Sequence, residues 1–256
     1  MSNATASIEA LTISDSDFRF PNEHGKIEYI CQGAVAFWNR VLVNSSPCVH
    51  LTTIEVGSGG GKSTLMNLVH SFLLGRPTSE IHLRMGGDYS RRNVAYIPQK
   101  PNNVLHWKIG TLVPNNSRYL ACMIEGLSAK FGQDRLASCS GGQLARILVA
   151  SALHRLELKV STSNYLLLDE AFEGLDSKLL AASLNGISQE WSQKHEDMHL
   201  FILIVTHLDV GLLQQALDPA KIDLHRVVLE RQPSQFYDNG RYETIPVMLS
   251  VANHAH

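Results

Sequence analysis

The chain has 256 residues, of which 44% are apolar and 18% charged, a composition typical of a folded globular protein and not of a disordered one. Lys and Arg number 22 against 24 Asp and Glu, so the formal net charge of -2 excludes a whole-molecule attraction to nucleic acid or to an anionic membrane. The four cysteines show no C-x-x-C spacing, which argues against a zinc motif and favours a reducing compartment. The sequence contains neither an apolar run of the roughly 20 residues that span a bilayer nor the pattern of a secretory signal. We therefore expect a cytoplasmic chain that does not itself cross a membrane.

Residues 5–54 contain short β-rich pieces separated by turn-forming stretches, which predicts strands in an N-terminal lobe. The strand-like sequence CVHLTTIEV then runs into the glycine loop at 57–61, and a helical pattern follows that ends at Gly75. A phosphate-binding loop requires a strand, a glycine loop and a helix in this order.

The next strand is predicted at 93–99, and the region from about 101 to 159 has a mostly helical pattern. Residues 165–170 and 200–207 form continuous apolar runs that end in polar residues, as expected of strands buried on both faces of a parallel sheet. An amphipathic helix between them completes a βαβ unit, so the predicted fold class is α/β. Residues 221–232 are expected to form a strand pair, and residues 241–256 either a closing strand or a disordered end.

The glycine loop suggests a chemical role that does not depend on any known relative. The backbone amides of Gly59, Gly60 and Gly61 can surround an oligophosphate, because no side chains intervene and the positive end of the following helix points at the anion. Lys62 would reach the terminal phosphates and Ser63 a magnesium ion. A flexible linker is the alternative, but a linker seldom runs directly into Lys-Ser-Thr and an apolar helix.

Two adjacent acids, Asp169 and Glu170, follow a buried apolar run, where open α/β sheets present groups that contact ligands. Asp169 is expected to hold magnesium through water, and Glu170 to polarise the water that attacks a γ-phosphate. The alternative is that both acids merely cap the next helix, but the glycine loop upstream argues against it.

Five motifs in one order make this chain resemble the ATP-binding cassette (ABC) ATPases. They are GSGGGKST at 57–64, AYIPQ ending at Gln99, SGGQ at 140–143, LLLDE at 166–170 with Asp176 after it, and VTH ending at His207. The SGGQ element separates this family from other phosphate-loop NTPases. The resemblance covers residues 50–210 and is weaker on either side.

The resemblance implies an α/β phosphate-loop NTPase core with a mostly parallel sheet, an N-terminal antiparallel β lobe and a small α-helical lobe. It implies one ABC ATPase domain over residues 1–256, with the core and β lobe at about 5–99 and 160–235 and the helical lobe at about 100–159. The ligands it implies are ATP and Mg²⁺. The nucleotide-binding residues would be Gly57, Ser58, Gly59, Gly60, Gly61, Lys62, Ser63, Thr64, Gln99, Ser140, Gly141, Gly142, Gln143 and Asp176.

The resemblance also assigns roles. Ser63, Gln99 and Asp169 would lie near magnesium, Glu170 would be the general base, and His207 would contact the γ-phosphate. In this family two cassettes close head to tail around two nucleotides. The SGGQ element would therefore face ATP held by a second subunit, and Asp176 would couple the two sites.

Some positions depart from the family pattern or leave a choice open. The first glycine of the loop pattern falls on Val56, and Cys139 replaces the leucine that usually precedes SGGQ. Adenine would stack on Phe20 or, as second choice, on Tyr29. Trp107 is either part of a docking surface or a core residue. The stretch 154–164 is expected to hold a surplus loop.

The leading hypothesis is an ATP-hydrolysing subunit of an ABC transporter. We expect it to act as a dimer of cassettes, most simply a homodimer. Separate transmembrane subunits would be its partners, and they would hold it at the cytoplasmic face of the membrane. The alternatives are a soluble ABC ATPase that serves as an assembly or nucleic-acid factor, and a nucleotide-binding regulator with low turnover. One set of motifs, and too few residues between Lys62 and Ser140 for a coiled coil, argue against translation and repair factors. No nucleic-acid partner is expected.

Overall fold

The structure is a computed structural model. It describes residues 48–56, 62–76, 92–99, 101–114, 116–124, 131–159, 163–172, 175–195 and 198–231, and several short strands outside these ranges. Within this part of the chain, no helix combines the length and apolarity needed to cross a bilayer.

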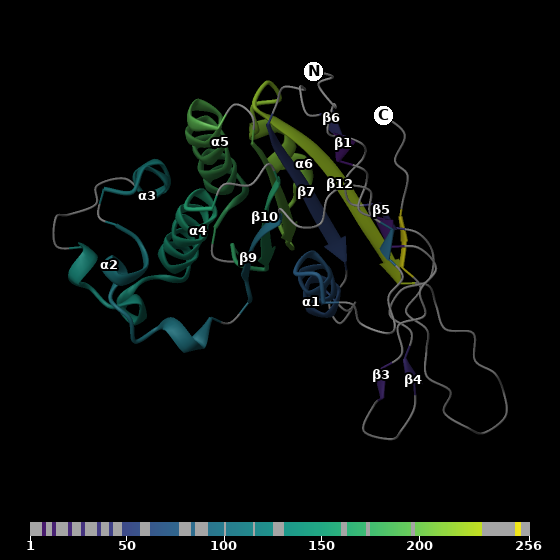
Figure 1. The fold of residues 1–256 in the computed structure, drawn as a ribbon, viewed down its shortest axis with the longest axis horizontal. Coiled ribbons are helices and arrows are strands. Elements are labelled where there is room, and N and C mark those ends of the chain that lie inside the picture. The colour runs from purple at the N-terminus through teal and green to yellow at the C-terminus, as the bar shows by residue number, and fades with distance from the viewer. Residues whose placement is uncertain are drawn as a thin grey trace, which may run out of the picture.

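A six-stranded sheet forms the centre of the molecule (Figure 1). Its strands pair in parallel except the last, β13, which runs antiparallel to β12. The predicted mostly parallel sheet is therefore confirmed. In spatial order the strands are β13 (Leu249–Val251), β12 (Ile222–Arg231), β7 (Val49–Val56), β11 (His199–Val205), β10 (Ser163–Asp169) and β9 (Arg92–Ile97).

Short antiparallel strands make up the described part of the N-terminal lobe, as expected. They form the pair β1–β6, the pair β3–β4 and the three-stranded set β5–β2–β8. Each is two residues long: β1 (Ser7–Ile8), β2 (Thr12–Ile13), β3 (Phe20–Pro21), β4 (Ile27–Glu28), β5 (Val35–Ala36), β6 (Val41–Leu42) and β8 (Leu83–Arg84).

Helices cover both faces of the central sheet (Figure 1). On one face α4 (Gly141–Glu157) and α5 (Ser177–Lys194) pack against the strands and share one hydrophobic core with them. On the other face α1 (Lys62–Leu73) contacts β9 and β10. The remaining helical segments are η2 (Asn102–Val104), α2 (Ile109–Leu112), α3 (Arg118–Met123), η3 (Phe131–Gln133), η4 (Leu136–Ser138) and α6 (Val210–Ala216).

One local prediction was wrong and one was too broad. Within 154–164, where a surplus loop was expected, α4 continues to Glu157 and keeps Leu156 buried in the core, so the loop lies between Glu157 and the start of β10 at Ser163. Residues 221–232 do not form a strand pair. They form one long strand, β12, that pairs with β7 from Ile222 opposite Val49 to Leu229 opposite Val56. Its continuous partner leaves no room for a turn within it. Of the two possibilities for residues 241–256, the structure shows a closing strand at Leu249–Val251, β13.

Candidate functional site

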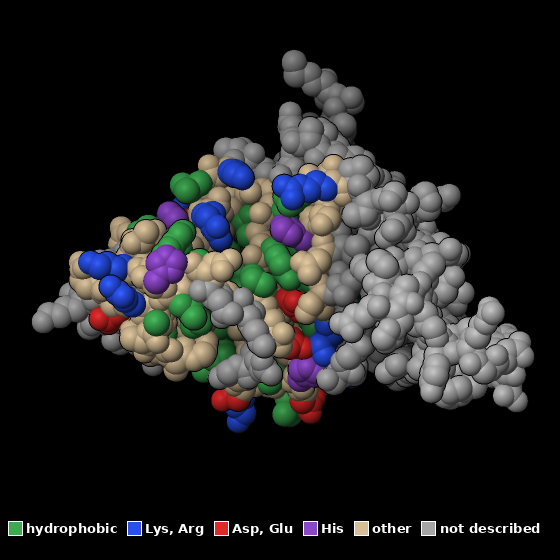
Figure 2. Space-filling view, turned by 90° about the horizontal axis from the view of Figure 1, so that it is seen from below, with side chains coloured by type: hydrophobic (Ala, Val, Ile, Leu, Met, Phe, Trp, Pro, Cys, Tyr) green, Lys and Arg blue, Asp and Glu red, His purple; other side chains and the backbone are tan. Residues whose placement is uncertain are grey.

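The strand register brings the candidate residues to one edge of the sheet. Asp169 at the end of β10 lies opposite Val205 of β11, and Val205 lies opposite Ile54 of β7. Three adjacent parallel strands therefore end almost level, and the segments that follow them start from the same edge. Figure 2 shows this edge from below, with acidic, Lys or Arg, and His side chains close together near the middle of the molecule.

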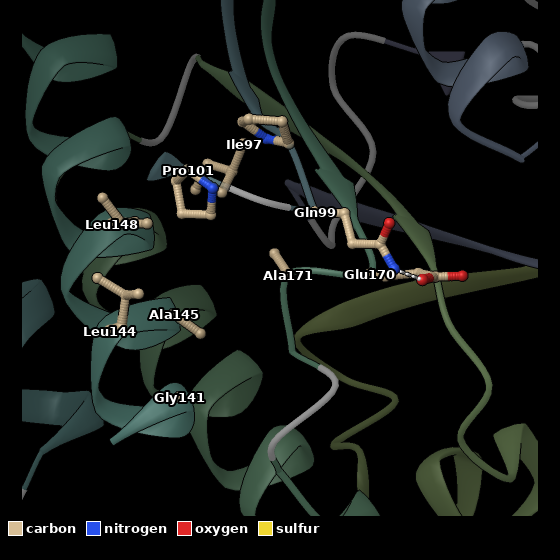
Figure 3. A pocket seen from close by; sticks show the side chains of 10 residues that line it. Ile97, Gln99, Pro101, Gly141, Leu144, Ala145, Leu148, Glu170 and Ala171 are labelled. Atoms are coloured by element: carbon tan, nitrogen blue, oxygen red, sulfur yellow. Dashed lines mark hydrogen bonds between the residues drawn. The ribbon is translucent and has the colours of Figure 1, made fainter. Parts of the chain in front are cut away.

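Glu170, directly after β10, contacts three of the predicted residues at once. Its Oε1 lies 3.1 Å from Nζ of Lys62 and 2.9 Å from Nε2 of His207. Gln99 donates a hydrogen bond from Nε2 to Oε2 (Figure 3). The side chains of Lys62 and Glu170 are each 8% exposed, whereas His207 is 49% exposed. The acid and the lysine are thus largely withdrawn from water.

The backbone of Glu170 is in an unusual conformation, with φ of 50°. A non-glycine residue in this left-handed region costs on the order of 1–3 kcal/mol, and such residues cluster at functional sites. The hydrogen bond from its N–H to the carbonyl of Val205, at 3.1 Å, holds the turn in place. The chain thus turns directly after β10, and the Glu170 carboxylate at this turn lies against Lys62, Gln99 and His207.

Asp169 is buried, and its two carboxylate oxygens differ in their surroundings. The Tyr96 hydroxyl donates a hydrogen bond to Oδ2 at 3.2 Å, whereas Oδ1 is buried without a hydrogen-bond partner among the described residues. Burial raises the pKa of Asp169, while hydrogen bonding from Ser63 and Tyr96 acts in the opposite direction. A buried carboxylate oxygen beside a serine hydroxyl matches the oxygen ligands that Mg²⁺ prefers. The residues present therefore fit a magnesium ion.

The SGGQ element forms the start of α4, as the sequence predicted. Ser140 is the N-cap: its hydroxyl accepts from the Gln143 N–H at 3.3 Å, and its own N–H donates to Oε1 of Gln143 at 3.0 Å. This capping box fixes the first turn. Gly141 is exposed and Gly142 is buried. An added Cβ at Gly141 would meet no atom of the described residues within 4 Å, so among these residues nothing covers this helix start.

A cavity of about 310 Å³ separates α4 from the carboxyl edge of the sheet. Gly141, Leu144 and Leu148 lie on one side of it, and Gln99 and Glu170 on the other (Figure 3). Within this chain the SGGQ element therefore stands apart from the cluster around Glu170.

The structure thus brings together Lys62, Gln99, Glu170 and His207, with Asp169 adjacent. Asp176 lies elsewhere, as the exposed N-cap of α5, where its Oδ1 accepts from the Leu179 N–H at 2.8 Å. Several predicted positions lie outside the described residues, or have no described side chain: Gly57, Ser58, Gly59, Gly60, Gly61, Thr64, Phe20 and Tyr29.

Tyr96 is a site residue that the sequence reasoning did not single out. It lies on β9, the strand that leads to Gln99. Its position in the AYIPQ motif, three residues before Gln99, is the feature of the sequence that could have identified it. Val56 is the last residue of β7, so the glycine loop begins one position later than the family pattern. Cys139 packs against the edge of the core, and burial raises the pKa of its thiol. Trp107, left open between two roles, is 41% exposed.

Comparison with known proteins identifies relatives of one kind. The chain is 33% identical over 163 residues, half of its length, to the ABC-type transporter MDR1 of Aureobasidium melanogenum. It is 36% identical over 115 residues, 44% of its length, to the sulfate/thiosulfate import ATP-binding protein CysA of Burkholderia mallei. The chain spans 11% of the fungal protein and 30% of the Burkholderia protein. No protein-family model matches it.

A solved structure from Pyrococcus furiosus, described as an ABC transporter ATP-binding protein, shares the fold. The TM-score is 0.52 at 13% identity, covering 85% of this chain and 97% of the other. At this identity the likeness supports the fold alone. Lys62, Gln99, Glu170 and His207, from four of the five motifs, meet at one sheet edge. Together with these relatives, which are ABC transporter ATP-binding proteins, they support an ABC nucleotide-binding domain in this chain.

Proposed function

We propose that this chain is a single cassette domain that hydrolyses Mg-ATP within a dimer of cassettes and drives separate transmembrane subunits of a transporter. The observation that carries the proposal is the contact of Glu170 with Lys62, Gln99 and His207 at the end of the central sheet. A general base, a phosphate-binding cation and two polar residues that sense the γ-phosphate are the groups that phosphoryl transfer to water requires.

The phosphates of ATP would compete with Glu170 for Lys62. Lys62 begins α1, where the helix N-terminus also favours an anion, so a triphosphate would draw the ammonium away from the carboxylate. Glu170, released from this ion pair, would then accept a hydrogen bond from a water molecule and orient it. His207, half exposed and next to the same carboxylate, is placed to follow the γ-phosphate.

Asp169 and Ser63 would hold magnesium, with Gln99 nearby. When bound, the ion neutralises charge that develops on the phosphate oxygens. The part of this chain is to supply the buried Oδ1 of Asp169 and the hydroxyl of Ser63 beside it.

A second cassette is proposed because the SGGQ element does not reach the site of its own chain. No described residue covers its capped helix start at Gly141, which lies across a cavity from Glu170. A head-to-tail partner could place its own helix start, with a partial positive charge, against the nucleotide. Both sites of such a dimer would then be complete.

The helical lobe offers a route from a membrane partner to the site. Trp107 is exposed, and its segment is hydrogen-bonded to the segment just before SGGQ: Leu136 N–H donates to the Trp107 carbonyl at 3.0 Å, and Ile109 N–H to the Asp134 carbonyl at 2.9 Å. Through these hydrogen bonds, a displacement of the Trp107 segment would be transmitted to the segment that leads to Ser140. We propose this surface as the contact with transmembrane subunits, which places the chain at the cytoplasmic face of a membrane.

The test compares three forms of the purified chain with and without membranes from its source. Wild type should release phosphate from ATP in a magnesium-dependent manner. Glu170→Gln should retain ATP and stay dimeric, with phosphate release reduced at least 100-fold, since the base is lost but the amide still contacts its neighbours. Lys62→Ala should instead weaken ATP binding itself, measured by calorimetry.

The outcomes separate the alternatives. Unchanged turnover in Glu170→Gln would exclude this residue as the base. No phosphate release by wild type, even with membranes present, would favour a nucleotide-binding regulator. Hydrolysis by a wild-type chain that co-purifies with soluble proteins and no multi-span protein would favour a soluble ABC factor.

A further inference from the structure

Tyr96 lies on β9 opposite Leu167 of β10, one strand over from the acid it contacts. Its hydroxyl donates to Oδ2 of Asp169 at 3.2 Å. Asp169 is at the end of β10, so this bond ties the ends of the two strands through side chains as well as through the backbone ladder. The strand that carries Tyr96 continues to Gln99, which donates to Glu170.

The ring of Tyr96 is fixed from the other side. His70 of α1 packs against it with ring centroids 4.9 Å apart and planes tilted by 32°. The ring therefore sits between the helix that follows the glycine loop and the strand that ends in Asp169. The hydroxyl of a ring held in this way stays within reach of Oδ2, to which it donates.

The consequence for Asp169 is that its two oxygens are no longer equivalent. A carboxylate turns about its last side-chain bond with two-fold freedom, and near Asp169 there are both a cation, Lys62, and a like charge, Glu170. Ser63 also hydrogen-bonds this carboxylate, and the Tyr96 donor on Oδ2 favours one orientation of it. Oδ1, which has no partner among the residues described, is then left for another ligand. Groups that orient a metal-binding carboxylate typically change metal affinity by 10–100-fold when they are removed.

We propose that Tyr96 is a positioning residue of the magnesium site: its hydroxyl holds Oδ2 of Asp169 so that Oδ1 is presented to the ion. This inference rests on the proposed function, because it assumes that Asp169 serves Mg-ATP. The inference goes beyond the proposed function because it assigns the orientation of the Asp169 carboxylate to a tyrosine on the neighbouring strand. This tyrosine would contact neither the nucleotide nor the ion.

The variant Tyr96→Phe tests it, since it removes one oxygen and keeps the ring against His70. The measurement is Mn²⁺ binding in the presence of a non-hydrolysable ATP analogue, followed by electron paramagnetic resonance, together with metal-free binding of the same analogue by calorimetry. We expect a metal affinity lowered by about 10–100-fold, with metal-free analogue affinity unchanged. In steady-state assays the magnesium concentration for half-maximal rate should rise while kcat at saturating metal stays close to that of wild type.

The matched control is Tyr119→Phe. It also removes a buried phenol hydroxyl that donates to a carboxylate, Oε1 of Glu157 at 2.5 Å, but at the far end of α4 from the site. Its metal affinity should equal that of wild type. Equal metal affinity in Tyr96→Phe and wild type would overturn the proposal. A parallel loss of metal-free analogue affinity and of melting temperature in Tyr96→Phe would also overturn it, because the role would then be structural. Since metal binding is measured without turnover, failure of wild type to hydrolyse ATP would count against the proposed function and leave this comparison intact.

Discussion

Glu157, at the C-terminal end of α4, joins three helices, and replacing it with Gln should make the stability of the protein much less dependent on acid pH. Arg118 and Tyr119 of α3 both donate to its Oε1, the latter at 2.5 Å. His195, the C-cap of α5, lies 3.1 Å from Oε1, and Lys194 lies 3.5 Å from Oε2. The Glu157 side chain is only 9% exposed, so these contacts are weakly screened.

The magnitude follows from the pKa of this carboxyl. Burial alone would raise the pKa of Glu157, but hydrogen bonds from Tyr119, Arg118 and His195 outweigh it and lower the value from 4.5 to about 2. A depressed folded pKa means that the ionised group stabilises the fold above the unfolded pKa and that this stabilisation is lost as pH falls toward the folded pKa. A difference of one unit between the folded and unfolded pKa corresponds to about 1.4 kcal/mol. The ionised Glu157 therefore contributes about 3 kcal/mol to the free energy of unfolding at neutral pH, and roughly half of this contribution is lost near pH 3.

The assay is urea unfolding followed by circular dichroism at several values between pH 7 and pH 3. Wild type should exceed Glu157→Gln by about 3 kcal/mol at pH 7, and the difference should narrow as the pH falls below 4.5, since Gln cannot titrate. Glu190→Gln is the matched control: Glu190 also pairs with Arg118, at 3.7 Å, but is 26% exposed. Its cost should stay below about 1 kcal/mol.

A wild-type advantage over Glu157→Gln that is the same at every pH would refute this reasoning, because the carboxyl would then act through packing and not through charge. Equal destabilisation by the two Glu→Gln variants would refute it as well. In that case the burial of Glu157 would not distinguish it from a surface acid.

Two further predictions concern the helical lobe. Gly110→Ala should destabilise the fold by roughly 1–3 kcal/mol in thermal or urea unfolding, because an added Cβ would come within 2.9 Å of the Gly132 carbonyl oxygen. Gly141→Ala, whose added Cβ would meet no described atom within 4 Å, should fold as stably as wild type. Equal stability of the two variants would contradict the steric argument. Trp107→Ala should leave the melting temperature and phosphate release of the isolated chain near wild type, since Trp107 is 41% exposed, yet reduce co-purification of a multi-span protein. Undiminished recovery of that protein would place the docking surface elsewhere.

The sequence was sufficient for the parts of the fold that periodicity and strand ends determine. Continuous apolar runs that end in Asp169 and His207 indicated buried parallel strands, and parallel strands bring their carboxyl ends to one edge. The order of the motifs then predicted which side chains meet there. Lys62, Gln99, Glu170 and His207 do meet, although no local feature of the sequence gives the distances.

What the sequence could not supply depended on contacts between distant segments. The extent of the loop after α4 was overestimated because Leu156 and Glu157 are held by strand β9 and by α3 and α5. The Leu156 carbonyl, for example, accepts a hydrogen bond from Asn93 at 2.7 Å. β12 was misjudged because its length is set by pairing with β7. Tyr96 was overlooked because an alternating tyrosine in a strand reads equally well as core, and only the register of β9 against β10 places its hydroxyl at Asp169.

The strand order explains why the Glu170 carboxylate can contact residues from separate segments of the chain. β11 lies between β7 and β10, so the turn after β10 borders on the segments after β11 and, one strand further, after β7. A residue that left β10 in an extended conformation would continue along the strand direction, away from both. The left-handed conformation of Glu170, held by the carbonyl of Val205, bends the chain so that its carboxylate reaches His207 and Lys62. Under the proposed function this strained turn has a chemical use: the acid pairs with Lys62 before nucleotide binds, and it would be released to a water molecule once the phosphates bind Lys62.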